Sequence, residues 1–129
     1  MSWCGSTVQR TALVMRRGDV WLVDFNPVRG SEANKIRPAV LVSNDRANAT
    51  AARLGYGVVT VIPVTSNVTN VYPFQVLLPV GTTGLLSASK AQAEQVRSLA
   101  VERLTQFLGR VTTDDLTDID NALRLHLDL

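Results

Sequence analysis

A proline that opens an apolar run constrains the fold of this chain more than any other feature of the sequence. Pro38 begins the run 38–43, whose aliphatic and β-branched side chains are typical of a buried strand. The same proline restricts the residue before it, Arg37, to extended backbone conformations. Arg37 is therefore predicted to stand at the end of a polar loop, with its five donors available for a phosphate or a carboxylate. A structural salt bridge is the alternative interpretation of a lone arginine.

A second unusual segment is the β-branched run 58–64, which ends in the polar residues Thr65, Ser66 and Asn67. Hydroxyl and amide groups at a strand end can bind phosphate oxygens or base edges. The same side chains also make turns by bonding the neighbouring backbone, and this is the preferred interpretation of Ser66 and Asn67. Thr65 follows a strand proline closely and is expected to project from the rim of the sheet.

Length, composition and charge predict one domain whose N-terminal half is basic. The chain has 129 residues, and 46% of them are hydrophobic, which is enough for a compact core. Residues 1–55 hold eight Lys or Arg against four Asp or Glu, whereas residues 56–129 hold five against seven. The halves thus carry +4 and −2, which favours a polyanionic partner. Aromatic residues make up only 5%, so stacking cannot be the main grip on nucleic acid.

The single cysteine, Cys4, excludes an intrachain disulfide and a cysteine-based metal cluster. The apolar segment 12–15 is too short for a signal-peptide core or a membrane span. We therefore expect a soluble cytoplasmic protein without membrane contact.

Local patterns predict several strands and two helices. Strands are expected over 18–25, 38–43, 58–64, 74–78 and 107–111. A short helix is expected over 46–54, with Asp45 as its N-cap and Gly55 as its stop. A C-terminal helix capped near Thr112 and Asp115 carries one apolar stripe that must cover the sheet; the stripe is Leu116, Ile119, Leu123 and Leu127.

Six collinear motifs, from about Arg16 to the C-terminus, resemble the MazF/PemK family of toxin endoribonucleases. They are the segments 17–21, 30–32, 35–40, 43–45, 63–67 and 94–97. The resemblance implies a mainly β (α+β) fold, namely a small SH3-like barrel with a C-terminal packing helix, as in the gyrase-poison toxins. It also decides the segment 89–99, where helix propensity conflicts with alternation, in favour of a strand. The toxin domain is expected over 16–129, with 1–15 as a flexible N-terminal extension.

RNA carries its own nucleophile, the 2′-hydroxyl, so cleavage needs alignment, proton transfer and stabilisation of negative charge. No metal ion or cofactor is required by this chemistry. The single histidine, His126, lies in the predicted C-terminal helix and cannot form a histidine pair. The acidic residues of that helix are expected at its surface; they are Asp114, Asp115, Asp118 and Asp120.

The resemblance implies that Arg37 binds the scissile phosphate and stabilises its developing charge, while Thr65 contacts the same phosphate. Arginine is an awkward general acid because its pKa is so high, and the electrostatic role is preferred. Glu32 is the carboxylate nearest to Arg37 in the loop sequence and is a candidate base for the 2′-hydroxyl proton. A simple ion pair of Glu32 with Lys35 or Arg37 remains open.

The resemblance also implies a set of RNA-binding residues, whose amides, hydroxyls and ammonium suit unpaired base edges and phosphates. They are Ser31, Lys35, Asn44, Ser66, Asn67 and Gln95. The expected substrate is single-stranded RNA, cut at a short sequence to leave a 2′,3′-cyclic phosphate or 3′-phosphate and a 5′-hydroxyl.

The family members act as homodimers and are inhibited by an antitoxin whose flexible acidic C-terminal tail occupies the RNA groove. Two rival functions remain open for this chain. One is a non-enzymatic gyrase poison on the same barrel, which has no need of the Arg37 and Thr65 pair. The other is a non-catalytic SH3-like RNA-binding module, which would follow if Arg37 were locked in a buried salt bridge.

Overall fold

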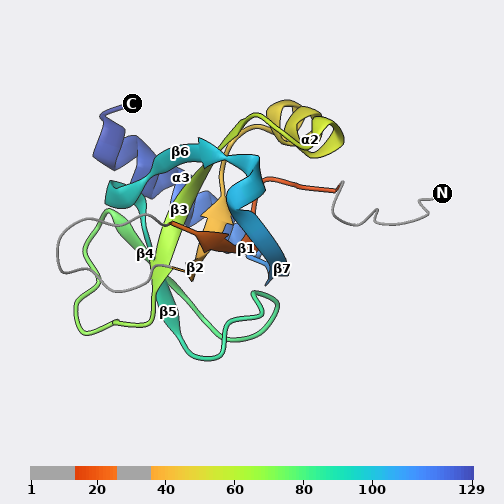
Figure 1. The fold of residues 1–129 in the computed structure, drawn as a ribbon. Helices are drawn as coiled ribbons and strands as arrows, with labels where there is room; N and C mark the ends of the chain where they lie inside the picture. The colour runs from red at the N-terminus through yellow and green to blue at the C-terminus, as the bar shows by residue number, and fades with distance from the viewer. Residues whose placement is uncertain (1–13, 26–35) are drawn as a thin grey trace, which may run out of the picture.

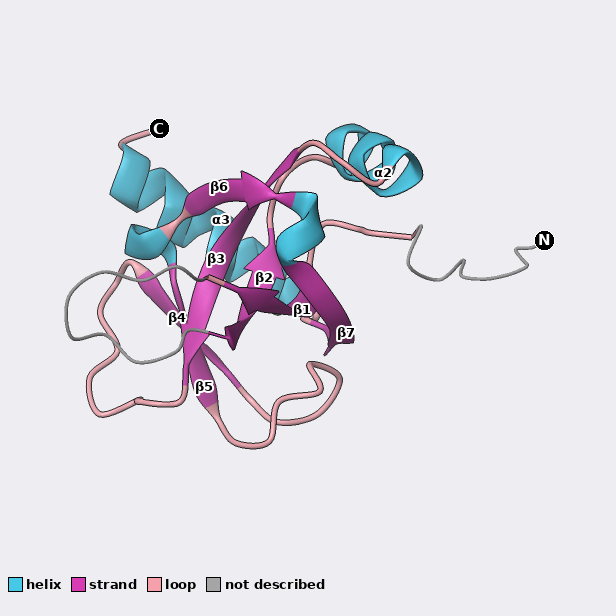
Figure 2. Cartoon of the chain, in the orientation of Figure 1, coloured by secondary structure: helices cyan, strands magenta, loops and turns pink. Residues whose placement is uncertain are grey.

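The computed structural model describes residues 14–25 and 36–129 as an antiparallel sheet covered by a C-terminal helix (Figure 1, Figure 2). In chain order the elements are β1 (Asp19–Asp24), β2 (Ile36–Leu41), α2 (Asp45–Leu54), β3 (Val58–Thr65), β4 (Gln75–Leu78), β5 (Ser89–Gln92), η2 (Ala93–Gln95), β6 (Arg97–Ala100), η3 (Val101–Arg103), β7 (Leu104–Arg110) and α3 (Thr113–Leu127). The predicted mainly β class with a C-terminal packing helix is confirmed.

The seven described strands form one sheet in the order β4-β5-β3-β2-β1-β7, and β6 also pairs with β3. β3 is the central strand, since β2 lies along one side of it and both β5 and β6 lie along the other. The predicted strand over 89–99 is therefore confirmed in two pieces. A single turn of 3-10 helix, η2, interrupts it and carries the chain from β5 to β6.

The strands separate the apolar side chains into two clusters on opposite faces of the sheet. Because residues alternate along a strand, Trp21 and Val20 fall into different clusters. The first cluster is Met15, Trp21, Val23, Phe25, Ala39, Leu41, Ala51, Ala52, Val59, Val61, Leu99, Val101 and Leu104. The second is Val20, Val40, Val42, Ile62, Val64, Val76, Leu78, Leu85, Ala91, Ala93, Val111, Ile119 and Ala122. α2 contributes to the first cluster, and α3 closes the second.

Both helix ends that the sequence predicts are found, with two corrections. Thr112 Oγ1 accepts a hydrogen bond from the Asp115 N–H at 3.0 Å, as expected for an N-cap of α3. Gly55 ends α2 with a positive φ of 75°, which glycine adopts without strain. The N-cap of α2, however, is Asn44 and not Asp45. In α3 the apolar stripe ends early, because Leu127 is exposed.

Two strand boundaries differ from the prediction because the pairing partner, and not the local sequence, decides where a strand begins. β2 begins at Ile36 because Asp24 of β1 pairs with it, and it ends at Leu41. Arg37 therefore lies inside the strand and not at the end of the loop before it. β7 begins three residues earlier than predicted, at Leu104, which pairs with Val23.

The described residues begin within the predicted N-terminal extension. Met15, the last residue of the predicted extension, is buried in the first cluster. Val14 is exposed, and residues 1–13 of that extension and residues 26–35 lie outside the described residues. No helix within the described ranges is long and apolar enough to cross a membrane.

Candidate nucleic-acid site

Arg37 and Thr65 are brought together by the register of β2 and β3. The two strands are antiparallel and pair Ala39 with Pro63 and Leu41 with Val61. The pairing ends at Ala39 and Pro63, and the same register continued two residues further along each strand sets Arg37 opposite Thr65. Residues two apart on a strand share a face, so both side chains project on the face of the first core cluster.

The Arg37 side chain is half-buried, and β1 holds its backbone through the pair with Val23. Within residues 14–25 and 36–129, no ion pair or hydrogen bond engages its guanidinium. The structural salt bridge, which was the alternative interpretation of this arginine, is therefore absent from that part of the chain. The guanidinium keeps its donors for an anion approaching this face.

Thr65 ends β3 and is half-buried. Its Oγ1 accepts a hydrogen bond from the Asn67 N–H at 3.2 Å. This is turn chemistry of the kind predicted for the next two residues, and it orients the hydroxyl without using its hydrogen. The Thr65 hydroxyl can therefore donate to a phosphate oxygen while its own oxygen holds the turn.

Ser66 and Asn67 are exposed at the start of the loop between β3 and β4. The Asn67 Oδ1 accepts a hydrogen bond from the Thr69 N–H at 3.2 Å, so the turn interpretation of Asn67 is confirmed. The amide Nδ2 of Asn67 remains available to a base or a phosphate. Both residues lie beside Thr65 in sequence and therefore belong to the same rim.

Asn44 and Gln95 lie elsewhere. Asn44 follows the far end of β2, and its Oδ1 caps α2 by accepting from the Ala47 N–H at 2.8 Å. The structure does not bring Asn44 next to Arg37. Gln95 is exposed at the end of η2, beside the middle of β3, whose residues Val61 and Val64 pair with the strands on either side of η2.

Three predicted site residues fall within residues 26–35, which the structure does not describe. They are Ser31, Glu32 and Lys35. Their roles stay predictions.

Two cations on the Arg37 face were missed by sequence reasoning. Lys90 pairs with Thr65 across β3 and β5 and is only 8% exposed. Arg97 pairs with Val61, and its guanidinium lies 5.3 Å from the centroid of the Phe25 ring, a cation–π contact. The sequence contains no signal for the burial of Lys90. In the alternating segment 89–95, Lys90 falls among the polar residues, which are normally exposed.

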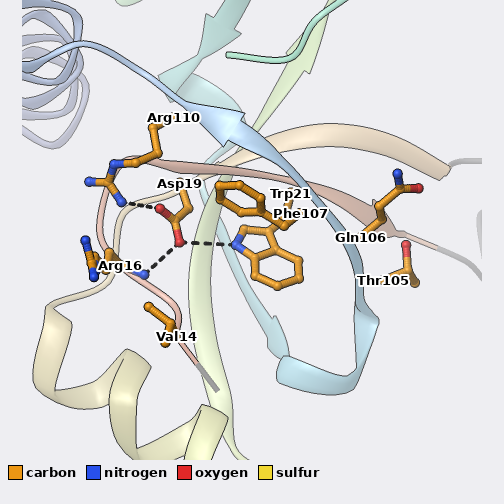
Figure 3. Close-up of a pocket in the computed structure, with 8 residues that line it drawn as sticks. All are labelled: Val14, Arg16, Asp19, Trp21, Thr105, Gln106, Phe107 and Arg110. Atoms are coloured by element: carbon orange, nitrogen blue, oxygen red, sulfur yellow. Dashed lines mark hydrogen bonds and ion pairs between the residues drawn. The ribbon is translucent and has the colours of Figure 1, made fainter. Parts of the chain in front are cut away.

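A separate hollow of about 620 Å³ lies at the other end of β1, between β1 and β7 (Figure 3). Its polar centre is the buried Asp19, which accepts hydrogen bonds from the Arg16 N–H at 2.8 Å and the Trp21 Nε1–H at 3.4 Å and pairs with Arg110. No predicted site residue among the described ones lines it. No cluster of three or more His, Cys, Asp or Glu that could hold a metal occurs among those residues either.

Comparison with known proteins identifies the class. The chain matches the PemK-like, MazF-like toxins of type II toxin-antitoxin systems over residues 16–127. Endoribonuclease MazF9 of Mycobacterium tuberculosis (strain ATCC 25618 / H37Rv) is 66% identical over 116 residues, covering 90% of this chain and 98% of that protein. A solved MazE-MazF structure (Form-II) from Deinococcus radiodurans is 28% identical with a TM-score of 0.70, covering 90% of this chain and 97% of that one.

An endoribonuclease solved with its cognate antitoxin, from a mycobacterial species, shares the fold at 23% identity with a TM-score of 0.70, over 89% of this chain and 96% of that one. These likenesses put the chain among small, mainly β toxin domains. The chain belongs to the PemK-like, MazF-like family of toxins of type II toxin-antitoxin systems.

Proposed function

We propose that this chain is an endoribonuclease that cuts single-stranded RNA at a short sequence without a metal ion. The observation that carries the proposal is the β2–β3 register, which, continued two residues beyond Ala39 and Pro63, sets Arg37 opposite Thr65 on one face of the sheet. The relative at 66% identity that is named as an endoribonuclease supports the same reaction class. A gyrase poison would have no use for this pair, and a binding module with a locked arginine would need an ion pair that the described residues do not supply to Arg37.

The reaction that fits these groups is an attack of the RNA 2′-oxygen on the adjacent phosphorus. Arg37 holds the non-bridging phosphate oxygens and stabilises the charge that develops on them, which is where fixed donors lower the barrier most. Thr65 donates its hydroxyl to the same phosphate and aligns it. Glu32 accepts the 2′-hydroxyl proton, the P–O5′ bond breaks, and the departing 5′-oxygen takes a proton from solvent water to become a 5′-hydroxyl. The other fragment ends in a 2′,3′-cyclic phosphate, which a water molecule can open to a 3′-phosphate.

The side chains around Arg37 and Thr65 contact the RNA nucleotides that flank the scissile phosphate. Ser66 and Asn67 are next to Thr65, and Ser31, Lys35 and Gln95 complete the proposed RNA-binding set. Asn44 stays outside the scissile-phosphate contact of its own chain, since it caps α2 at the other end of β2. Unpaired bases are the expected ligands because their hydrogen-bonding edges are exposed.

Cleavage of a long single-stranded RNA is expected to continue in excess EDTA. The physical reason is that the substrate supplies its own nucleophile and Arg37 supplies the positive charge. Gel analysis of the RNA fragments measures the outcome, with the Arg37→Ala protein purified in parallel to exclude a contaminating nuclease. Complete inhibition by EDTA that a divalent ion reverses would refute metal independence.

The chain is also expected to be a homodimer whose two 28–36 loops flank a shared RNA groove. A domain of this size offers little concave surface alone, whereas a two-fold pair doubles the basic rim and covers edge strands. Sedimentation at micromolar concentration checks this. A monomer of about 14.0 kDa that still cleaves RNA would contradict the shared groove and leave the chemistry of Arg37 and Thr65 intact.

The groove also takes the flexible acidic C-terminal tail of a cognate antitoxin, which orders on binding and excludes RNA. The sheet and α3 form an SH3-like barrel with its packing helix, residues 16–129 make the toxin domain after an extension, and the protein works in the cytoplasm on cellular RNA.

A further inference from the structure

Lys90 is a buried cation without an anionic partner among residues 14–25 and 36–129. Only 8% of its surface is exposed. Its Nζ donates a hydrogen bond to the Asn70 carbonyl oxygen at 2.6 Å and lies 5.9 Å from the centroid of the Tyr72 ring. A carbonyl and an aromatic ring are weak compensation for a buried charge, which proteins usually pair with an anion.

The position of Lys90 in the sheet indicates which anion it can bind. Lys90 on β5 pairs with Thr65 on β3, and the β2–β3 register sets Arg37 on the other side of Thr65. The three residues therefore form one row across three adjacent strands. With strands about 4.8 Å apart, the two cations stand roughly 10 Å from one another at the backbone, with the Thr65 hydroxyl between them.

The direction of the row is settled by its neighbours. Val64 pairs with Ala91, Ala91 pairs with Val76, and all three are buried in the second core cluster beneath α3. Because side chains alternate along a strand, Thr65 and Lys90 project to the opposite face. That is the face on which Arg37 lies.

The loop between β3 and β4 covers Lys90, and ring stacking and hydrogen bonds fix its conformation. Tyr72 stacks on Phe74 with the ring centroids 5.6 Å apart and the planes at 9°. The Gln75 Oε1 accepts from the Tyr72 N–H at 3.2 Å, and Gln75 Nε2 donates to Glu94 at 2.7 Å. The ammonium is thus held at one place, with one of its three donors used and two left over.

We propose that Lys90 is a second phosphate-binding cation of the RNA site, which takes the phosphate next to the one held by Arg37 and Thr65. This inference rests on the proposed function. It also fixes how the RNA backbone lies along the row of Arg37, Thr65 and Lys90. The scissile phosphate binds at Arg37 and Thr65, and the flanking phosphate binds at Lys90, under the loop that carries Ser66 and Asn67. The contact to the Asn70 carbonyl holds the ammonium in place before RNA arrives.

The test measures how RNA affinity depends on salt. A fluorescein-labelled pool of single-stranded RNA with 2′-O-methyl riboses binds without being cut, and anisotropy gives its Kd at several KCl concentrations. Lys90→Met should weaken Kd by about five- to tenfold at 100 mM KCl and should reduce the slope of log K against log salt by about 0.7, the value for one lost phosphate contact on a single strand. Lys90→Gln retains a donor for the Asn70 carbonyl and should lose the same slope.

The matched control is Arg124→Met, which removes one positive charge from an exposed position on α3, the helix that covers the opposite face. Its Kd and slope should equal those of the unmodified protein. A weaker Kd with an unchanged slope in both Lys90 variants would overturn the phosphate contact and leave Lys90 as a support of the loop. Unchanged Kd and slope would overturn the inference altogether, whereas an unmodified protein that neither binds nor cuts RNA would refute the proposed function instead.

Discussion

Replacing Arg37 with alanine is expected to lower the rate of RNA cleavage by about a hundredfold or more. A fixed donor that faces developing negative charge contributes most in the transition state, and its loss from comparable sites costs two to three orders of magnitude. Single-turnover cleavage of a long single-stranded RNA measures the effect. Because Arg37 lies in β2 between β1 and β3, the folded state of the variant is checked by its thermal unfolding midpoint.

Two further variants make this prediction specific. Arg37→Lys should recover little activity, because an ammonium cannot reproduce the planar fork of donors on a phosphate. Arg53→Ala, at an exposed position on α2, removes the same charge away from the row and should leave the rate unchanged. Near-normal turnover by folded Arg37→Ala protein would remove Arg37 from the site.

Helix ends were predictable because their chemistry is local. A hydroxyl at Thr112 bonds an N–H three residues later, and Gly55 accepts a positive φ, whatever lies elsewhere in the chain. Even so, the choice between Asn44 and Asp45 as the cap of α2 was missed. Both residue types are good caps, and only the folded backbone shows which side chain reaches the free N–H.

Strand boundaries and the 89–99 segment depended on partners that are distant in sequence. Ile36 and Arg37 are in β2 because Asp24 and Val23 pair with them. The break at η2 lies where β3 changes its partner from β5 to β6, and Glu94 is held there by Gln75 of β4. No propensity of the residues 93–95 contains that information.

For the candidate site, the family resemblance assigned Arg37 and Thr65 to the same phosphate, and the β2–β3 register supplies the structural reason that they can share it. Lys90 escaped notice because a lysine in an alternating strand is normally exposed. Its burial follows from Tyr72 and Asn70 closing over it, which is a tertiary effect. Asn44 shows the opposite case, a polar residue that matched a motif and is used as a helix cap.

The largest expected loss of stability comes from Arg110→Ala. Asp19 is buried, with its side chain 3% exposed, and Arg110 is its ionic partner (Figure 3). Removing one partner of a buried pair leaves an uncompensated charge, which typically costs 3–5 kcal/mol in the free energy of unfolding. Because the Arg110 side chain is 41% exposed and water partly screens it, we expect about 3 kcal/mol, the lower end of that range. Urea denaturation at fixed protein concentration measures it.

A double-mutant cycle separates the buried charge from lost packing. Asp19→Asn keeps an oxygen that can accept from the Arg16 N–H and the Trp21 Nε1–H, and it removes the charge. Introduced into Arg110→Ala, it should therefore restore part of the lost stability, so that the two substitutions are clearly non-additive. Arg124→Ala, on the exposed face of α3, should change the free energy of unfolding by no more than about 0.5 kcal/mol. If the two changes in the free energy of unfolding were strictly additive, Arg110 would not act by neutralising Asp19. Arg110 would then stabilise this end of β1 through its packing and its hydrogen bond to the Arg17 carbonyl oxygen.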